Sequence, residues 1–311
     1  DINFFFVIAR KIVHFFKTAR MSILALVYIT FIGSMLIAND MALLTFLPLG
    51  FLVLSSTGKQ KYMAFTFIMQ NIAANLGGML TPFGNPQNLY LFSYYGLSTK
   101  TFFSAMLPPF ILSAVLILLC CLAFPKDRLS VPETQVTIDS RQAAIYGGLF
   151  CLAVAMVLRL VPYVLGLTVI VLALWFLDRH ALKTVDWGLL ATFAAFFTFS
   201  GNLARMEAVH ILFARLLSHG TMLISALTCQ IISNVPAAIL LSRFTQDACG
   251  LLVGVNVGGA GTLVASLASL ITFREYTHHV PNGGKQFLFL FSGISFAFLA
   301  ILLTAMSVLG W

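Results

Sequence analysis

The sequence predicts an all-α polytopic membrane protein made of two inverted repeats, each with a re-entrant hairpin and a broken transmembrane helix. Of its 311 residues, 60% are hydrophobic and 9% are charged, whereas soluble domains carry about 25% charged residues. Apolar runs such as 102–124 and 287–309 are long enough to cross a hydrocarbon core that needs roughly 20 residues. In addition, two short patterns occur twice, in the same order, in the two halves of the chain.

These repeated patterns lie in apolar segments, where polar residues and helix breakers are costly. NLGGMLT at 75–81 shares its asparagine, both glycines and its threonine with NVGGAGT at 256–262. Upstream, IANDMALL from Ile37 and ISNVPAAI from Ile232 share an isoleucine, an asparagine and an alanine. Irregular backbone at membrane depth persists only where protein or a wet cavity satisfies it. Paired interruptions in two halves therefore indicate the substrate site of a secondary transporter.

The first repeat is predicted at 1–124. After a short segment, its elements are expected to be a hairpin at 21–55, a broken helix at 62–96 interrupted at 75–88, and a span at 102–124. The hairpin tip is expected at Asn39–Asp40, because the return segment is short for a membrane crossing. Two ordinary spans are the alternative to this hairpin.

The polar segment 125–141 is expected to be a cytoplasmic linker, and the second repeat is predicted at 142–311. Its elements are expected to be spans at 142–160, 163–178 and 187–204, a connector at 205–219, a hairpin at 220–243, a broken helix at 248–272 interrupted at 256–262, a loop at 273–286 and a last span at 287–309. The first repeat begins in its connector and has no counterpart of the third of these spans. We therefore expect one or more leading spans to be missing.

The basic residues support this topology. With the open end of the first hairpin in the cytoplasm, thirteen of the 18 lysines and arginines fall inside and five outside, which is the bias of a correctly oriented membrane protein. The second hairpin then opens to the opposite side, so the repeats are inverted. Because the net charge of +8 reflects orientation in the membrane, no nucleic-acid partner is expected.

Tips and interruptions should bring polar groups together at mid-membrane. Each return helix begins just after a tip, and helix N-termini carry about +0.5 charge, which suits an anion. Carbonyl, amide and hydroxyl oxygens suit a small cation. The residues expected to bind substrate or ions are Asn39, Asp40, Asn75, Thr81, Gly84, Asn85, Asn88, Ser233, Asn234, Asn256, Gly258, Gly259, Thr262 and Ser266. A Na⁺ site is expected among Asn39, Asn85, Asn234 and Thr262.

The glycines of the interruptions have two interpretations. They permit positive φ and close approach of a ligand to the backbone. The alternative is that they only let helices pack closely, as glycine often does in membranes.

Asp40 is the one acidic residue at predicted membrane depth. An aspartate at a helix centre costs roughly 2.5 to 3.5 kcal/mol on insertion scales, so such residues are rare and usually functional. Asp40 could accept a coupling proton or bind a cation. The alternative, a cap for the return helix, is compatible with either role.

An enzyme is not expected. All six histidines fall in predicted connectors or loops, and no GxSxG motif is present. The five cysteines have neither metal-binding nor disulfide spacing. No lysine or arginine falls at the predicted midplane, which favours a small or weakly charged ion over a citrate-like one. We expect no cofactor, and H⁺ or Na⁺ as the coupling ion.

The strings IANDMALLTFLPL, TPFGNPQNLYL, ISNVPAAILLS and GVNVGGAGTLVASLASLI resemble motifs of the ion transporter superfamily. This superfamily includes arsenite/antimonite permeases, sodium/proton antiporters and divalent anion:sodium symporters. The chain looks most similar to the citrate-transporter-like inner-membrane branch, over nearly its whole length. The resemblance implies a homodimer in the bacterial inner membrane, with a substrate domain that moves as a rigid elevator.

In the symporter branch, Ser-Asn-Thr tips and the neighbouring unwound segments form sodium sites and hold a carboxylate. Ser233 and Asn234 match the first two positions, but Val235 replaces the threonine, and the other tip reads Ala-Asn-Asp. These departures weaken the case for sodium coupling and dicarboxylate selectivity, and Asp40 favours proton coupling.

The leading hypothesis is a secondary active transporter that moves a small anion or oxyanion, coupled to H⁺ or Na⁺. A cation/proton antiporter is the alternative within transport. An ion channel is the alternative from another class, because it could use the same interruptions.

Overall fold

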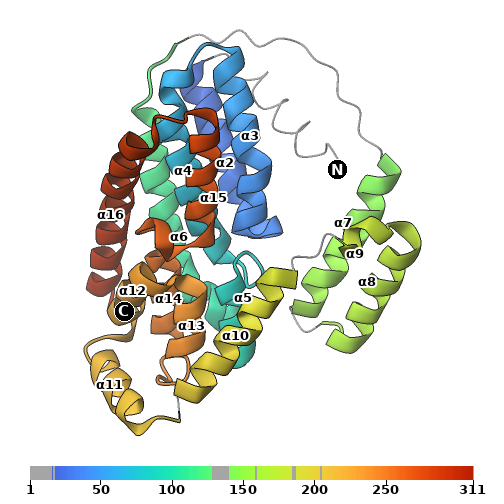
Figure 1. Ribbon diagram of the computed structural model, residues 1–311, viewed down its shortest axis with the longest axis vertical. Helices are drawn as coiled ribbons and strands as arrows, with labels where there is room; N and C mark the ends of the chain where they lie inside the picture. Colours follow the sequence, from blue (N-terminus) through green and yellow to red (C-terminus); the bar gives the residue numbers. More distant parts are fainter. Residues whose placement is uncertain are drawn as a thin grey trace.

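The computed structural model describes residues 16, 18–127, 140–157, 160–183, 187–203 and 205–310. These residues form α-helices and short 3-10 helices and no strand (Figure 1), which confirms the all-helical prediction. The α-helices are, in order, α2 (Ala19–Ile37), α3 (Asn39–Ser56), α4 (Met63–Gly77), α5 (Pro86–Tyr94), α6 (Thr99–Leu122), α7 (Ser140–Val157), α8 (Tyr163–Leu177), α9 (Arg179–Lys183), α10 (Trp187–Leu203), α11 (Glu207–Leu217), α12 (Thr221–Ile232), α13 (Asn234–Leu241), α14 (Ala248–Gly258), α15 (Leu267–His279) and α16 (Gly284–Val308). The 3-10 helices are η1 (Gln60–Tyr62), η2 (Gly78–Leu80) and η3 (Leu263–Ala265).

By length and composition, three of the described helices could cross a membrane, namely α2, α6 and α16. The remaining apolar helices are shorter, among them α3, α8 and α14. Together with the composition, they describe an integral membrane protein. Most of the expected linker at 125–141 lies outside the described residues.

The central helix of the bundle is α4, and nearly all of its residues are buried. It packs against α2, α3, α6, α15 and α16. Its buried amides, Gln70, Asn71 and Asn75, donate hydrogen bonds inside the bundle, as buried polar groups generally do. Phe67, Ile68 and Ile72 of α4 are fully buried in the main core, together with Phe287 and Phe291 of α16.

Both expected broken helices are interrupted close to the predicted places. α4 is separated from α5 by η2 and an irregular segment, and Pro86 is the first residue of α5, where its missing N–H costs nothing. α14 is separated from α15 by η3, and Ser266 caps α15 by accepting a hydrogen bond from the Ser269 N–H at 3.3 Å. In Figure 1, α4 and α15 lie in the upper part of the bundle, and α14 and α5 in the lower part.

The predicted loop at 273–286 is wrong in its first half, because α15 continues to His279. Two of the six histidines, His278 and His279, therefore lie in the last turn of a helix and not in a loop. The imidazole of His279 stacks on Phe51 of α3, with ring centroids 3.5 Å apart. Its Nε2 also lies 3.1 Å from Glu275 Oε1. The stacking on α3 and the contact with Glu275 one turn earlier in α15 favour helical structure in a stretch whose composition is typical of a loop.

The start of α2, the loop after α3 and the end of α6 meet at one end of the bundle. Ala19 N donates to Asp127 O at 2.7 Å, and Lys59 Nζ lies 2.7 Å from Asp127 Oδ2. The hydrogen bond from Lys59 lowers the pKa of the Asp127 carboxyl below its ordinary value. Partly exposed pairs of this kind stabilise only modestly.

We expect Asp127→Asn to lower the unfolding temperature slightly at neutral pH and to have no effect in strong acid. A depressed carboxyl pKa adds stability above the ordinary pKa, and this stability is lost as the pH falls through the lowered value. Thermal unfolding of both proteins across this pH range measures the difference. An unchanged difference after acidification would contradict the assignment.

Candidate functional site

Two turns in the described chain share an unusual backbone conformation. Ala38, between α2 and α3, has φ 65° and ψ 152°, and Ser233, between α12 and α13, has φ 72° and ψ 157°. They are the two non-glycine residues with positive φ among those described, and they occupy equivalent positions of the repeated IAND and ISNV patterns. Such conformations cost about 1 to 3 kcal/mol and persist where the surroundings enforce them, often at functional sites.

Each of these tips is hydrogen bonded to the interruption of its own half. Asn39 N donates to Gly84 O at 3.1 Å, and Ser233 Oγ donates to Ala265 O at 3.4 Å. Gly84 and Ala265 lie the same number of residues after the paired asparagines 75 and 256. The tips therefore contact corresponding points of the two interruptions.

The paired threonines also make equivalent contacts. Thr81 Oγ1 donates to Met35 O at 2.7 Å, and Thr262 Oγ1 donates to Gln230 O at 3.1 Å. Each acceptor is a carbonyl in the last turn of the helix that leads to a tip. Both hydroxyl protons thus connect a broken segment to a hairpin helix, and each hydroxyl oxygen keeps its lone pairs as acceptors.

The motif glycines are explained by close approach and not by positive φ. Positive φ does not occur at Gly77, Gly78, Gly84, Gly258, Gly259 or Gly261, so that part of the expectation is wrong. A Cβ on Gly77 would lie 2.2 Å from the Phe31 carbonyl oxygen, and one on Gly258 would lie 2.8 Å from Ala226 Cα. The first glycine of each pair therefore lets the broken helix touch the backbone of the hairpin helix.

The second glycine of each pair makes room for an asparagine side chain. A Cβ on Gly78 would lie 2.4 Å from Asn85 Oδ1, and one on Gly259 would lie 2.9 Å from Asn234 Nδ2. In each motif, the first glycine therefore allows close helix packing, and the second makes room for an asparagine of the proposed polar centre.

Asn256 is the centre of a buried amide cluster between α14 and α5. Its Oδ1 accepts hydrogen bonds from Asn85 Nδ2 at 3.1 Å and from Gln87 Nε2 at 3.2 Å. Its Nδ2 donates to Asn88 Oδ1 at 2.6 Å and to Leu252 O at 2.8 Å. All four amide residues are at most 1% exposed, so the two halves of the chain meet here through polar groups that lie out of contact with solvent.

A second polar cluster joins α4 to α15 and to the first tip. Asn39 Nδ2 donates to Asn75 Oδ1 at 3.2 Å, and Asn75 Nδ2 donates to Asn71 O at 3.1 Å. Asn71 Nδ2 in turn donates to Ser269 Oγ at 3.3 Å, and Thr272 Oγ1 donates to Asn71 Oδ1 at 3.3 Å. Asn75 and Asn256 occupy equivalent positions of the repeated pattern, but Asn256 bonds the other half directly, whereas Asn75 bonds residues of its own half and the link across is made by Asn71.

The expected set did not include four residues of these clusters, Asn71, Gln87, Ser269 and Thr272, or Gln230, which bonds the second interruption. Asn71 lies one helical turn before Asn75, and amides four residues apart share a helix face, so the sequence carried a usable signal. Gln87 lies inside the TPFGNPQN interruption. Gln230 Nε2 donates to Gly258 O, and Gln230 Oε1 accepts from Thr262 N, both at 2.8 Å. The position of Gln230 relative to the repeated patterns did not indicate these contacts.

Asp40 lies in the first turn of α3, half-buried beside the first tip. Its N–H donates to Asn39 Oδ1 at 2.9 Å. It takes part in neither of the ion pairs formed by the described residues. An acidic residue in the first turn interacts favourably with the helix dipole. The N-cap position of α3 makes no side-chain capping hydrogen bond, so the dipole is the one part of the capping interpretation that the structure supports.

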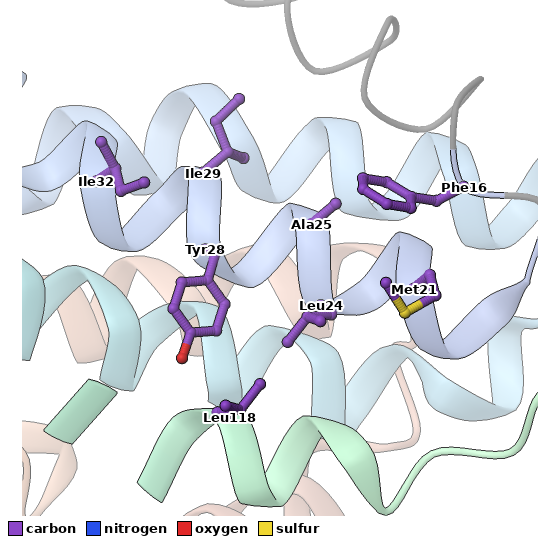
Figure 2. A pocket seen from close by; sticks show the side chains of 8 residues that line it. All are labelled: Phe16, Met21, Leu24, Ala25, Tyr28, Ile29, Ile32 and Leu118. Atoms are coloured by element: carbon purple, nitrogen blue, oxygen red, sulfur yellow. The ribbon is translucent and has the colours of Figure 1, made fainter. Parts of the chain in front are cut away.

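Two hollows formed by the described residues are lined almost entirely by apolar side chains. Figure 2 shows a groove of about 520 Å³ between α2 and α6, lined by apolar side chains and by the ring of Tyr28, whose hydroxyl already donates to Ala114 O at 2.7 Å. A hollow of about 440 Å³ beside the first tip is lined by apolar residues of α2, α3 and α7, by Phe83 and by Thr45. No group of three metal-ligating side chains occurs among the described residues.

Comparison with known proteins places this arrangement in a family. A model of the citrate transporter family matches residues 1–251. The chain belongs to that family. The resemblance inferred from the motifs is therefore confirmed, and the chain is a membrane transporter.

Two relatives extend the comparison. An uncharacterized transporter of Methanocaldococcus jannaschii is 33% identical over 312 residues, which cover 100% of this chain and 85% of the relative. The inner membrane protein YbiR of Escherichia coli K12 is 31% identical over 283 residues, which cover 88% of this chain and 74% of that protein.

Proposed function

We propose that this citrate transporter family member is a secondary active transporter of a small anion or oxyanion, coupled to H⁺ or Na⁺. The observation that carries the proposal is the pair of strained tips, Ala38 and Ser233, each bonded to the interruption of its own half. Irregular backbone at membrane depth needs polar partners. These partners form a polar centre between two halves of the chain, and a transporter would work by moving one half relative to the other.

The proposed site lies at mid-membrane, between two inverted repeats with re-entrant hairpins. The recurring tip, threonine and glycine contacts support a twofold relation between 1–124 and 142–311. In Figure 1, α2 and α3 reach the centre from the upper end, and α12 and α13 reach it from the lower end. α2 is long enough for a full span, but its tip contacts Gly84 inside the bundle, which favours the re-entrant interpretation.

A small, weakly charged anion fits the site better than a citrate-like one. Helices α3 and α13 begin at the two tips, and α5 begins at the end of the first interruption. Helix N-termini favour anions. No lysine or arginine is among the residues of the two amide clusters, so a multiply charged substrate would lack counter-charges.

The proposed setting is an inner membrane, like that of YbiR, with the chain acting as a homodimer.

Uptake into proteoliposomes tests the function. Purified protein would be supplied with a panel of oxyanions and carboxylates under an imposed Na⁺ or H⁺ gradient, with empty liposomes as the control. Accumulation of one anion against its gradient is the expected result. Na⁺/H⁺ exchange without anion uptake would instead identify an antiporter, and single-channel currents without accumulation would identify a channel.

We expect Asp40→Asn to abolish proton-coupled uptake, or to flatten its pH dependence, while the protein remains folded. The substitution keeps the size of the side chain and removes its capacity to bind and release a proton. Initial uptake rates between acidic and alkaline pH measure the effect, and Asp247→Asn, at the start of α14, is a matched control. A wild-type pH profile in Asp40→Asn would eliminate this residue as the proton carrier.

A further inference from the structure

The apolar groove between α2 and α6 ends beside a basic residue. Figure 2 shows Phe16 and Met21 at one end of this groove and Ile32 at the other, with Leu118 on the α6 side. Arg20 directly precedes Met21 in the chain, so it lies at the first of these ends. Ile32 and Leu118 are 53% and 37% exposed, so the groove faces outward from the described bundle. Its lining suits a hydrocarbon chain better than a polar ligand.

Arg20 places positive charge and free N–H donors at the start of α2. Its Nε donates to Phe124 O, which uses one of the five N–H donors of an arginine. The side chain makes no other hydrogen bond with the described residues. Guanidinium groups bind phosphate through pairs of parallel hydrogen bonds, and helix N-termini favour anions. Arg20 therefore has both the donors and the position to hold a phosphate group.

The segment that follows α6 brings a lysine to the same place. Ala19 N donates to Asp127 O at 2.7 Å, so this segment contacts the first residue of α2. Lys126 directly precedes that contact and is exposed. The carboxylate of Asp127 is paired with Lys59. Arg20 and Lys126 take part in neither ion pair of the described residues, so their charges are available to an anion.

Aromatic rings indicate that this end of the bundle lies at the level of the lipid headgroups. Tyr62 packs edge-on against Phe124, with ring centroids 5.6 Å apart, and its hydroxyl donates to Asp127 Oδ2 at 3.3 Å. The exposed Lys61 places its Nζ 5.0 Å from the centre of the Tyr62 ring. Tyrosines are enriched at membrane–water interfaces. In the orientation that the basic residues predict, this end is cytoplasmic, and the cytoplasmic leaflet carries the anionic lipids.

We propose that an anionic phospholipid binds here, with one acyl chain in the groove between α2 and α6 and its phosphate between Arg20 and Lys126. Both features are needed, because the groove alone would accept any lipid tail and the two cations alone would accept any anion. The inference goes beyond the proposed function and does not depend on it. Bound lipid would connect the start of α2 to the end of α6, and α2 is the helix that leads to the first tip.

Thermal unfolding of the purified full chain in detergent tests the site without any transport. The protein is titrated with dioleoyl phosphatidylglycerol or with dioleoyl phosphatidylcholine, which have the same acyl chains and differ in headgroup charge. A ligand that binds the folded state raises the unfolding temperature as its occupancy increases. We expect phosphatidylglycerol to give half of its maximal shift at a severalfold lower lipid fraction than phosphatidylcholine. Inorganic phosphate at the same ionic strength should give no shift, because it cannot fill the groove.

Two substitutions test the headgroup contact and the groove separately. Lys126→Gln should raise the half-effect fraction of phosphatidylglycerol about fivefold, as expected for the loss of one basic residue near an anionic headgroup, and leave the response to phosphatidylcholine unchanged. Ala25→Phe should weaken the response to both lipids, because Ala25 lines the groove and the larger ring would occupy it. If Ala25→Phe fails to fold, Ala25→Leu replaces it, with a smaller effect in the same direction.

Each substitution has a matched control elsewhere on α6 or beside it. Lys100 is an exposed lysine in the first turn of α6, at the opposite end of that helix from Lys126. Ala305 lines a different apolar groove, of about 720 Å³, between α6 and α16. Lys100→Gln and Ala305→Phe should both leave the half-effect fraction of phosphatidylglycerol unchanged.

Several results would overturn the proposal. Equal effects of the two lipids on the wild type would show that the headgroup is not recognised, and an equal shift with inorganic phosphate would show that the groove is not used. An unchanged response to phosphatidylglycerol in Lys126→Gln, or in the Ala25 variant that folds, would separate the effect from these residues. A change in Lys100→Gln as large as that in Lys126→Gln would show that the lipid senses overall charge and not this site.

Discussion

Asn256→Leu is expected to abolish transport and to lower the stability of the protein by about 2 to 4 kcal/mol. Asn256 makes four side-chain hydrogen bonds. Three of them join α14 to Asn85, Gln87 and Asn88 of the first half, and the fourth goes to Leu252 O within α14. Interhelical hydrogen bonds in membrane proteins contribute about 0.6 kcal/mol on average and up to about 1.7. Leucine would in addition leave the Asn85, Gln87 and Asn88 amides with unpaired groups, which raises the cost.

Thermal unfolding and proteoliposome uptake measure the two effects separately. Asn202→Leu on α10 is the control, because Asn202 is exposed and lies outside both clusters. Asn256→Asp keeps the shape but sets an acceptor against Asn88 Oδ1 and Leu252 O in place of the Nδ2 donor. We expect it to lose transport and also to lose stability, because an unpaired buried carboxylate is costly. Wild-type uptake in Asn256→Leu would show that the cluster between α14 and α5 is not part of the site.

Gly77→Ala is the second substitution for which we expect a large effect. Its Cβ would lie 2.2 Å from the Phe31 carbonyl oxygen and 2.6 Å from Ser34 Oγ. A side-chain hydroxyl can rotate away, but the carbonyl belongs to the backbone of α2, so α2 and α4 would have to separate. Overpacking of this kind costs about 1 to 3 kcal/mol. The separation would also displace the first tip from Gly84, so transport should be lost.

The yield of folded protein and its unfolding temperature report the packing effect, and uptake reports the displacement of the tip. Gly293→Ala on α16 is the control, because nothing lies within 4 Å of a Cβ at that position. Gly258→Ala, whose Cβ would lie 2.8 Å from Ala226 Cα, should be milder than Gly77→Ala. Equal stability of Gly77→Ala and Gly293→Ala would refute the close contact between α2 and α4.

The helices and their interruptions were largely predictable because their causes are local. Long apolar runs cannot be placed in water, and the segment 81–88, with two prolines, a glycine and two asparagines, is costly to keep as a continuous helix at membrane depth. The end of α15 was not predictable in this way. His278 and His279 look like loop residues in sequence, but the stacking of His279 on Phe51 is a contact between helices far apart in the chain.

The sequence by itself determined that this chain is helical, apolar enough for a membrane, and built around two copies of a costly polar pattern. Periodicity, composition and repetition are properties of single segments, so they can be read without knowing what lies opposite. Only the tertiary structure decided that Asn256 meets Asn85 and Gln87, and that two of their oxygens remain unpaired. Hydrogen bonds between side chains about 170 residues apart depend on how helices pack, and no pattern within either segment specifies the partner.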